Sequence, residues 1–471
     1  MRAAQISAII LGIVGLMAGA VAAFYLLAGA LGVVAQAALG ADAAYIGVAV
    51  ANAITLLLVV VMVIASMLTL AERKWSALMQ DRIGPNRARF GLPGLKNQSL
   101  AGLPHFLADG IKMLTKEDFI PKDASKLLFT LAPMLGFGSV FVLFTVVPMA
   151  PVISAAELPG IAGMASAMGV SAAFPVSLHV APNLEIGLLF LFAFASIAVY
   201  GTSLAGWASN NRFALLGGVR GAAQMIAYEV SLGMSLVGAM MIFGTLQLEG
   251  MTAAQSAGIF GGALPAWGIF LQPMGFLLFF TASLAETKRA PFDAPEGESE
   301  IVGYFVEYSG MRFGMFMISE FVEIVVLSGV TAAIFLGGFH MPFPPSWGVD
   351  AWLAAKAGGF GLAVAQGLTF LLKVVALCWV QLTIRWTMTR FRYDQIQTLG
   401  WKILLPLALG NIVVTAVLLL LDQSLDTLAI VGIAELVLLI GLTALYPVKR
   451  PTSVRFSGQG AAAPVVSGHG H

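Results

Sequence analysis

The chain has 471 residues, of which 59% are hydrophobic and only 10% are charged. A soluble domain carries about 25% charged residues, so this composition excludes an ordinary soluble protein and indicates an integral membrane protein. The formal net charge of +1 gives no reason to expect a nucleic-acid partner. The single cysteine, Cys378, excludes an intrachain disulfide, and one thiol cannot hold an iron–sulfur cluster, which needs about four ligands.

Apolar stretches long enough to span a membrane follow one another along almost the whole chain. A hydrocarbon core of about 30 Å needs about 20 apolar residues in a helix, and the alternation of a membrane barrel is absent. The sequence therefore predicts an all-α polytopic membrane protein with about ten transmembrane helices. The expected spans cover residues 6–38, 46–70, 127–149, 184–207, 213–244, 267–286, 313–338, 361–385, 403–421 and 428–446.

Basic residues are distributed unevenly among the loops between these spans. With a cytoplasmic amino terminus, the outer loops contain one basic residue, Lys356, whereas the inner segment from Arg73 to Lys126 alone contains ten. This asymmetry satisfies the positive-inside rule. We therefore expect both termini to lie in the cytoplasm.

The two ends of the chain differ in character from the middle. The first apolar stretch has more than 30 residues, longer than a signal-peptide core of about 7–15, which favours an extra transmembrane helix in residues 1–44 over a cleaved signal. Residues 45–446 form the predicted membrane domain. Residues 447–471, rich in Gly, Ala, Ser and Pro, are expected to be a disordered cytoplasmic tail.

The first long cytoplasmic loop carries two amphipathic patterns. In residues 72–83, apolar side chains recur at helical spacing before Gly84-Pro85-Asn86 ends the pattern, and a second stripe follows. Both predict helices on the membrane surface, although a docking face for a soluble partner is the alternative. The stripes consist of Trp75, Leu78, Met79 and Ile83, and then Leu100, Leu103, Leu107, Ile111 and Leu114.

Few charged residues fall inside the predicted spans, and four of them are candidates for a polar pathway. A charge in the membrane costs roughly 2.5–3.5 kcal/mol on insertion, so such residues face protein or water and often mark a pathway. Structural ion pairs are the alternative for each residue alone, but four together favour a hydrated polar axis. The four are Glu229, Glu320, Glu323 and Lys373, and the structural or ion-pairing candidates are Arg220, Arg312 and Lys373.

Acidic residues are densest in residues 286–323, which contain eight of the 24 acids. A solvated loop is the simplest explanation, but the segment also contains Phe292, Ile301, Tyr304 and Phe305 and is too apolar for a tether. We expect it to fold against the membrane domain. Carboxylates crowded where water is scarce tend to hold protons near neutral pH, as proton carriers must.

Common cofactor motifs are missing from the sequence. No nucleotide-binding loop of the Gly-x-x-x-x-Gly-Lys kind occurs. His105, His179 and His340 are scattered, and the terminal His469 and His471 lie in a tail that supplies no geometry. We predict no metal site.

Two long polar motifs, ERKWSALMQDRIGPNRAR (residues 72–89) and AETKRAPFDAPEGESEIVGYFVEYSG (residues 285–310), carry a resemblance to a known family. They closely resemble the H subunit of proton-translocating NADH-quinone oxidoreductase, the bacterial respiratory complex I, which is the counterpart of mitochondrial NADH dehydrogenase subunit 1. The likeness continues through residues 198–229 and 385–394 and covers about residues 45–446. The added first span and the Pro-rich outer loop 148–182 depart from the family pattern.

The resemblance implies a subunit that lines a quinone chamber where the peripheral and membrane arms join, and that couples quinone reduction to proton translocation. Quinone is then the substrate, other membrane-arm subunits and the quinone-site subunits of the peripheral arm are the partners, and FMN, NAD and iron–sulfur clusters lie on partner subunits. No residue of this chain is expected to be catalytic by itself. The resemblance places Glu72, Arg73, Asp293, Glu296, Glu298 and Glu300 at the chamber and Glu229, Glu307 and Glu320 on the proton path, to which the position of Glu323 adds a fourth acid.

Other functions remain open at this point. A similar subunit occurs in membrane-bound hydrogenases and related dehydrogenases that do not use NADH. The buried charges also suit a stand-alone ion transporter, and a passive membrane anchor would tolerate their neutralisation. The choice between ubiquinone and menaquinone stays undecided.

Overall fold

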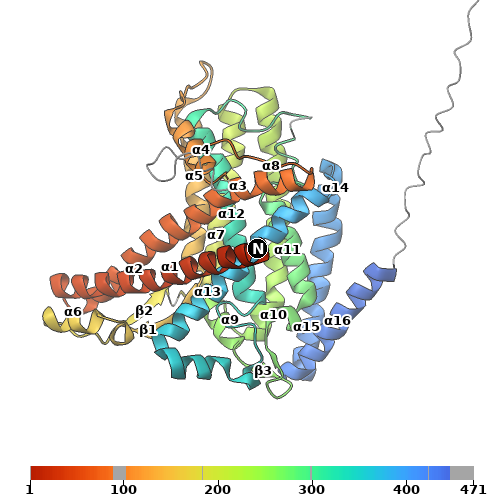
Figure 1. Cartoon of the computed structure of the whole chain (residues 1–471). Coiled ribbons are helices and arrows are strands. Elements are labelled where there is room, and N and C mark those ends of the chain that lie inside the picture. Colours follow the sequence, from red (N-terminus) through yellow and green to blue (C-terminus); the bar gives the residue numbers. More distant parts are fainter. Residues whose placement is uncertain (1, 89–101, 183, 298–299, 423, 446–471) are drawn as a thin grey trace, which may run out of the picture.

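The structure, a computed structural model, describes residues 2–88, 102–182, 184–297, 300–422 and 424–445. Within these ranges nine helices are long and apolar enough to cross a membrane. The chain is therefore an all-α polytopic integral membrane protein (Figure 1), as the sequence predicts. The expected tail, residues 447–471, lies outside the described residues.

The elements follow one another as long helices with short helices and two small hairpins between them. The α-helices are α1 (Arg2–Leu39), α2 (Ala44–Asn52), α3 (Met62–Met79), α4 (Pro104–Thr115), α5 (Lys126–Leu143), α6 (Ile161–Ala167), α7 (Gly187–Ala208), α8 (Arg212–Phe243), α9 (Leu248–Ala254), α10 (Gly268–Leu271), α11 (Pro273–Glu286), α12 (Gly310–Phe335), α13 (Val349–Thr387), α14 (Tyr393–Thr398), α15 (Leu405–Leu421) and α16 (Leu425–Leu445). The antiparallel hairpins are β1 (Ala150–Ser154) with β2 (Pro175–Leu178), and β3 (Gly258–Ile259) with β4 (Leu264–Pro265).

One of the ten expected spans, residues 267–286, is not a continuous helix. It divides into α10 and the 14-residue α11. Gln272 between them has φ −145° and ψ 62°, and Pro273 has no N–H for a helical bond to the preceding turn. Residues 273–286 alone are shorter than the roughly 20 residues that a full span needs.

The expected surface helix over residues 72–83 is not a separate element. A continuous helix of 36 residues runs from Ala44 to Met79 through α2, the π-helical stretch Ala53–Val61 and α3. No glycine or proline interrupts the good helix formers at the join, so residues 72–79 form the last turns of α3. Their expected place on the membrane surface stays a prediction. The second expected surface helix corresponds to α4, whose Ile111 and Leu114 are 60% and 70% exposed.

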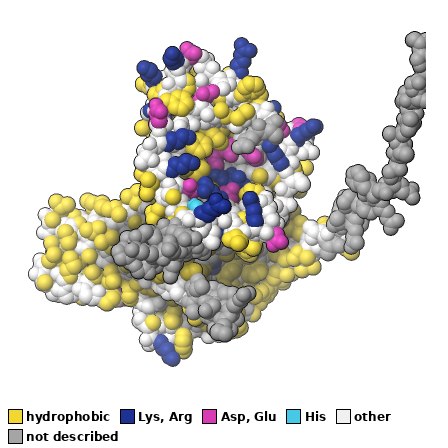
Figure 2. Space-filling model, turned by 45° about the horizontal axis from the view of Figure 1, so that its top comes forward, with side chains coloured by type: hydrophobic (Ala, Val, Ile, Leu, Met, Phe, Trp, Pro, Cys, Tyr) yellow, Lys and Arg dark blue, Asp and Glu magenta, His cyan; other side chains and the backbone are white. Residues whose placement is uncertain are grey.

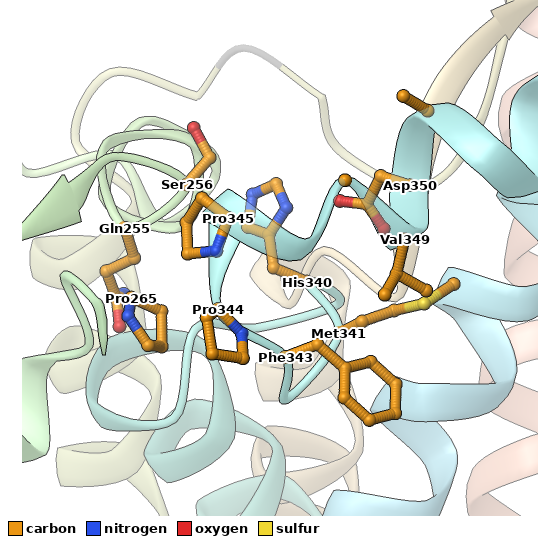
Figure 3. A pocket seen from close by; sticks show the side chains of 12 residues that line it. Gln255, Ser256, Pro265, His340, Met341, Phe343, Pro344, Pro345, Val349 and Asp350 are labelled. Atoms are coloured by element: carbon orange, nitrogen blue, oxygen red, sulfur yellow. The ribbon is translucent and has the colours of Figure 1, made fainter. Parts of the chain in front are cut away.

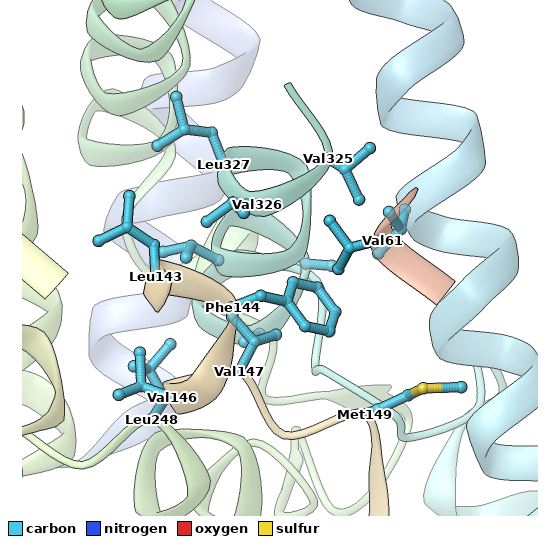
Figure 4. Packing of buried hydrophobic residues seen from close by; sticks show 14 of the residues in the cluster. Val61, Leu143, Phe144, Val146, Val147, Met149, Leu248, Val325, Val326 and Leu327 are labelled. Carbon is cyan, nitrogen blue, oxygen red and sulfur yellow. The ribbon is translucent and has the colours of Figure 1, made fainter. Parts of the chain in front are cut away.

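Helix α12 forms the centre of the molecule. Every residue from Ser319 to Phe335 is buried, as expected for a helix that is apolar on all sides and surrounded by others. Figure 4 shows its residues Val325 and Val326 near Val61, the last residue of the π-helical stretch before α3, and near Phe144, which directly follows α5. Because α12 occupies this position, its two carboxylates at Glu320 and Glu323 lie inside the protein.

The loops gather at two opposite ends of the helical bundle. Figure 1 shows α4 and α14 at one end, and α9, β3 and the β1–β2 hairpin toward the other. Charged side chains crowd the first end, whereas apolar side chains cover the flanks (Figure 2). This segregation is the one expected of a protein whose flanks face lipid.

Helix α1 and residues 148–182 pack on one another. The Tyr25 hydroxyl of α1 donates to the Pro151 carbonyl oxygen of β1 at 2.6 Å, and Asn52 of α2 donates to the carbonyl oxygens of Ser177 and His179 at 2.7 and 2.9 Å. Gly32 of α1 lies against Phe174, so that a Cβ atom there would stand 2.5 Å from the ring. These two segments, which are expected to depart from the family pattern, therefore form one unit.

We expect Gly32→Val to loosen this unit, because overpacking a fitted contact costs about 1–3 kcal/mol. The matched control is Gly19→Val on the same helix, because no neighbouring described atom lies within 4 Å of the position that a Cβ atom at Gly19 would take. Protease cleavage within residues 150–178, measured on membrane vesicles that expose this loop, should be several times faster in the Gly32 variant than in wild type. Equal cleavage in both variants would contradict the packing described here.

Candidate functional site

The acidic segment between α11 and α12 is folded against neighbouring helices. The side-chain amide of Gln224 in α8 donates to the carbonyl oxygens of Ala285 and Phe292, both at 2.8 Å. The guanidinium of Arg390 donates to the Asp293 carbonyl oxygen at 2.9 Å. These contacts hold the backbone of the segment in place, so its side chains occupy fixed positions.

The centre of the site is Arg289, a residue that the sequence reasoning missed. Its guanidinium pairs with Glu72 of α3 at 2.9 Å and with Glu320 of α12 at 2.7 Å, and it lies over the Phe321 ring, 4.0 Å from the centroid. Glu72 also pairs with Arg385 of α13 at 2.7 Å. Four distant parts of the chain thus meet in one network of alternating charge.

Arg289 keeps its charge although it is only 8% exposed. Burial opposes the charge, but the carboxylates of Glu320 and Glu72 outweigh burial and raise the pKa of the guanidinium. An opposite charge within about 4–6 Å favours the charged form in this way. The network is therefore a fixed cation surrounded by acids.

Two acids of the loop are suited to carry protons. Burial raises the pKa of Asp293 to about 6, although Arg390 and Arg385 act in the opposite direction. Burial also raises the pKa of Glu296 well above its usual range, and the neighbouring Glu320, with which it shares a hydrogen bond, adds to the effect. A protonated Glu296 can therefore donate to the Glu320 carboxylate.

A surface depression of about 500 Å³ adjoins this network. Glu72, Arg73, Ser76, Arg82 and Trp386 are among the residues that line it. Glu72 belongs both to this wall and to the ion pairs with Arg289 and Arg385, so a molecule in the depression would lie next to the buried network.

On its other side, the network adjoins a small internal cavity. Glu229, Glu286 and Glu323 come together in its otherwise apolar wall, and its volume of about 20 Å³ has room for a single water molecule. Ser196 donates to the Glu229 carboxylate. The sequence analysis did not select Glu286, because the expected span 267–286 placed it at a loop boundary. The signal that could have found Glu286 is Pro273, because a helix that begins there and ends at Glu286 has only 14 residues.

Other predicted site residues lie apart in local pairs. Among the described residues, Arg73 pairs with Asp109 at 2.7 Å on the surface, and Arg220 pairs with Glu300 at 2.9 Å. The Glu307 carboxylate accepts a hydrogen bond from the Asn211 side-chain amide at 2.7 Å. Arg312 forms an ion pair with Asp118 at 3.1 Å. The predicted Glu298 lies outside the described residues.

Lys373 lies near the opposite end, away from the acids. Its ammonium donates to the carbonyl oxygens of Leu336, Gly338 and His340 at 2.6, 2.9 and 2.6 Å, which extend the end of α12. Burial, together with Lys373, lowers the pKa of His340 to about 4, so this imidazole is neutral. Figure 3 shows His340 and Asp350 at a pocket of about 220 Å³ on this side.

In the part of the chain that the structure describes, no group of three or more His, Cys, Asp or Glu side chains could hold a metal ion. The site is thus a network of ions and hydrogen bonds that can bind a polar head, stabilise charge and hold protons.

Comparison with known proteins agrees with the motifs at this site. The family model described as NADH dehydrogenase matches residues 51–416. The chain is 42% identical over 371 residues to the first of the H subunits of NADH-quinone oxidoreductase of Geobacter metallireducens, covering 78% of this chain and 95% of the relative. It is 37% identical over 382 residues to the H subunit of the same enzyme of Bdellovibrio bacteriovorus (78% and 95%), and 38% identical over 353 residues to NADH-quinone oxidoreductase subunit 8 of Rhodothermus marinus (75% and 92%). The chain therefore belongs to the NADH dehydrogenase family of membrane subunits.

Proposed function

We propose that this chain is the membrane subunit of an NADH-quinone oxidoreductase that forms part of the quinone chamber and couples quinone reduction to proton translocation. The observation that carries the proposal is the position of the Arg289 network between the surface depression at Glu72 and the internal cavity of Glu229, Glu286 and Glu323. The names of the relatives favour this enzyme over a hydrogenase subunit.

The proposal assigns different parts of the reaction to different subunits. Reduction of a quinone to the quinol takes two electrons and two protons. The electrons come from NAD-linked FMN and iron–sulfur chemistry on partner subunits of the peripheral arm, and this chain supplies a wall, charges and protons. Other membrane-arm subunits carry protons onward. We place the complex in the inner membrane of a bacterium, with both ends of this chain in the cytoplasm.

The acids near Arg289 link the quinone head to the membrane interior. Negative charge that develops on the head competes with Glu72 and Glu320 for the Arg289 guanidinium, because all three are anions near one cation. Weaker pairing at Glu320 changes the field at Glu323, three residues further along α12. Protons held by Glu323, Glu286 and Glu229 then redistribute around their shared cavity. Of the remaining chamber residues, Arg73 lines the depression, Glu296 adjoins Glu320 and Glu300 pairs with Arg220. The chamber role of Glu298 stays a prediction from the sequence.

The pH dependence of quinone reduction tests Asp293. Burial raises the pKa of this carboxyl to about 6, so it holds a proton below pH 6 and loses it above. If protonated Asp293 supplies a proton to the quinone, the single-turnover rate falls as pH rises through about 6, approaching tenfold per pH unit. Asp293→Asn should lose this limb, whereas Asp109→Asn on the surface should keep it. An unchanged limb in Asp293→Asn would exclude this role.

Arg289→Lys should lower NADH-quinone reductase activity at least about tenfold, because one ammonium cannot replace a planar guanidinium that binds two carboxylates and stacks on a ring. Arg312→Lys is the matched control, since Arg312 has a single ion-pair partner in Asp118 among the described residues. NADH oxidation by an artificial acceptor at the peripheral arm reports whether the complex is assembled. Normal quinone reduction in an assembled Arg289→Lys enzyme would refute the central role of the network.

Glu229→Gln and Glu286→Gln should reduce the number of protons moved per NADH more than they reduce quinone turnover, because both remove a proton-binding group from the internal cavity. Glu185→Gln, at an exposed position in an outer loop, is the control. The measurement is the proton-to-electron ratio of the whole complex in sealed vesicles. A normal ratio at normal rate in both cavity variants would exclude the cavity from the proton path.

A further inference from the structure

A carboxylate that the sequence reasoning missed, Glu435, lies midway along α16. It is half-buried and lines a groove of about 490 Å³ between α11, α15 and α16. The backbone N–H of Met274 donates to it, but a charge at this depth is costly and normally faces an opposite charge. Among the described residues, no lysine, arginine or histidine forms an ion pair with it.

The groove exists because α16 leaves the bundle. Near its start, α16 packs closely, with Leu428 and Ala429 buried and Gly432 against the Phe270 carbonyl. Figure 1 shows that its second half leans away from α15, where Leu438 and Ile440 are both 59% exposed. The α16 residues that line the groove recur at helical spacing and form one face: Leu428, Val431, Ala434, Glu435 and Leu438.

The groove also has polar groups and a small residue opposite Glu435. Gln272 donates to the Thr415 hydroxyl at 2.5 Å and accepts from Asn411 at 2.8 Å, so these side chains bind one another. Gly410 of α15 also lines the groove, and no neighbouring described atom lies within 4 Å of the position that a Cβ atom on it would take. Small residues let membrane helices approach closely, and side-chain hydrogen bonds between helices strengthen such contacts.

The depth of Glu435 decides what kind of partner can reach it. The 21 residues of α16 rise by about 1.5 Å each, close to the roughly 30 Å hydrocarbon thickness. Glu435 is then about 15 Å from either interface, beyond the reach of the lipid headgroups. A cation that pairs with this carboxylate must therefore be carried into the membrane by a polypeptide span.

We propose that the α11–α15–α16 groove binds a transmembrane helix of another membrane subunit of the complex, and that a lysine, arginine or histidine in the middle of that helix pairs with Glu435. The complementary charge and the depth of the carboxylate select this occupant. The inference rests on the assembly in the proposed function, but not on the quinone or proton roles.

A photo-crosslinking amino acid placed in the intact complex tests the occupant. Leu438 faces the groove, whereas the equally exposed Ile440 lies about 200° around the same helix and is the matched control. The probe at position 438 should capture a membrane span of a co-purifying subunit with a basic residue in its middle, and the probe at 440 should capture lipid. Only lipid adducts at 438, or a captured span without a basic residue, would overturn the proposal.

Charge reversal then tests the pairing itself. Glu435→Lys should lose most of the captured subunit and its crosslink, and Glu435→Gln should lose less because the amide still hydrogen-bonds. Changing the captured basic residue to Glu in the Glu435→Lys background should restore both. Full retention of the subunit by Glu435→Lys would overturn the pairing. Quinone reduction is measured separately, so failure here leaves the Arg289 test unaffected.

Discussion

The cost of placing a charged guanidinium inside a membrane protein governs this structure. Arg289 is acceptable where it lies because carboxylates from α3 and α12 neutralise it, and removing one partner of a buried pair typically costs about 3–5 kcal/mol. The need for these partners fixes how α3, the loop before α12 and α12 itself come together. Arg385 extends the same constraint to α13 through Glu72.

The short distance between Glu320 and Glu323 determines how strongly a change in charge at one carboxylate affects the other. Glu320 and Glu323 are three residues apart on one helix, a separation of about 5–6 Å between Cβ atoms. At an effective dielectric constant of about 20, two unit charges 6 Å apart interact by ~3 kcal/mol. A change in charge at Glu320, which touches Arg289, is therefore felt strongly at Glu323, which lines the internal cavity. Simple electrostatics connects the two without any large movement.

Sequence reasoning found the features that stand out against an apolar background. Long apolar runs predicted the nine helices of the described residues that are long enough to cross a membrane, and Glu229, Glu320 and Glu323 were visible as acids inside such runs. Arg289 was missed because it follows Thr287 and Lys288 in a polar loop, where a charge is ordinary. Its importance comes from Glu72, which is 217 residues away, and from Glu320 on α12, and such contacts have no local signature. Composition likewise does not specify where the backbone stays helical, so neither the end of α3 at Met79 nor the break at Gln272 was predicted.

Lys373 and Glu435 show two solutions to the same energetic problem. Both carry ionisable groups within apolar helices, and both would be costly if left without partners. Lys373 meets three carbonyl oxygens of its own chain where α12 ends, so its requirement is satisfied internally. Glu435 instead faces a groove whose other polar side chains already bind one another, and the Met274 N–H supplies a hydrogen bond but no full positive charge. Because the protein works as a subunit, the counter-ion proposed for Glu435 lies on a neighbour. A carboxylate inside the membrane that forms no ion pair among the described residues then becomes a criterion for where assembly occurs.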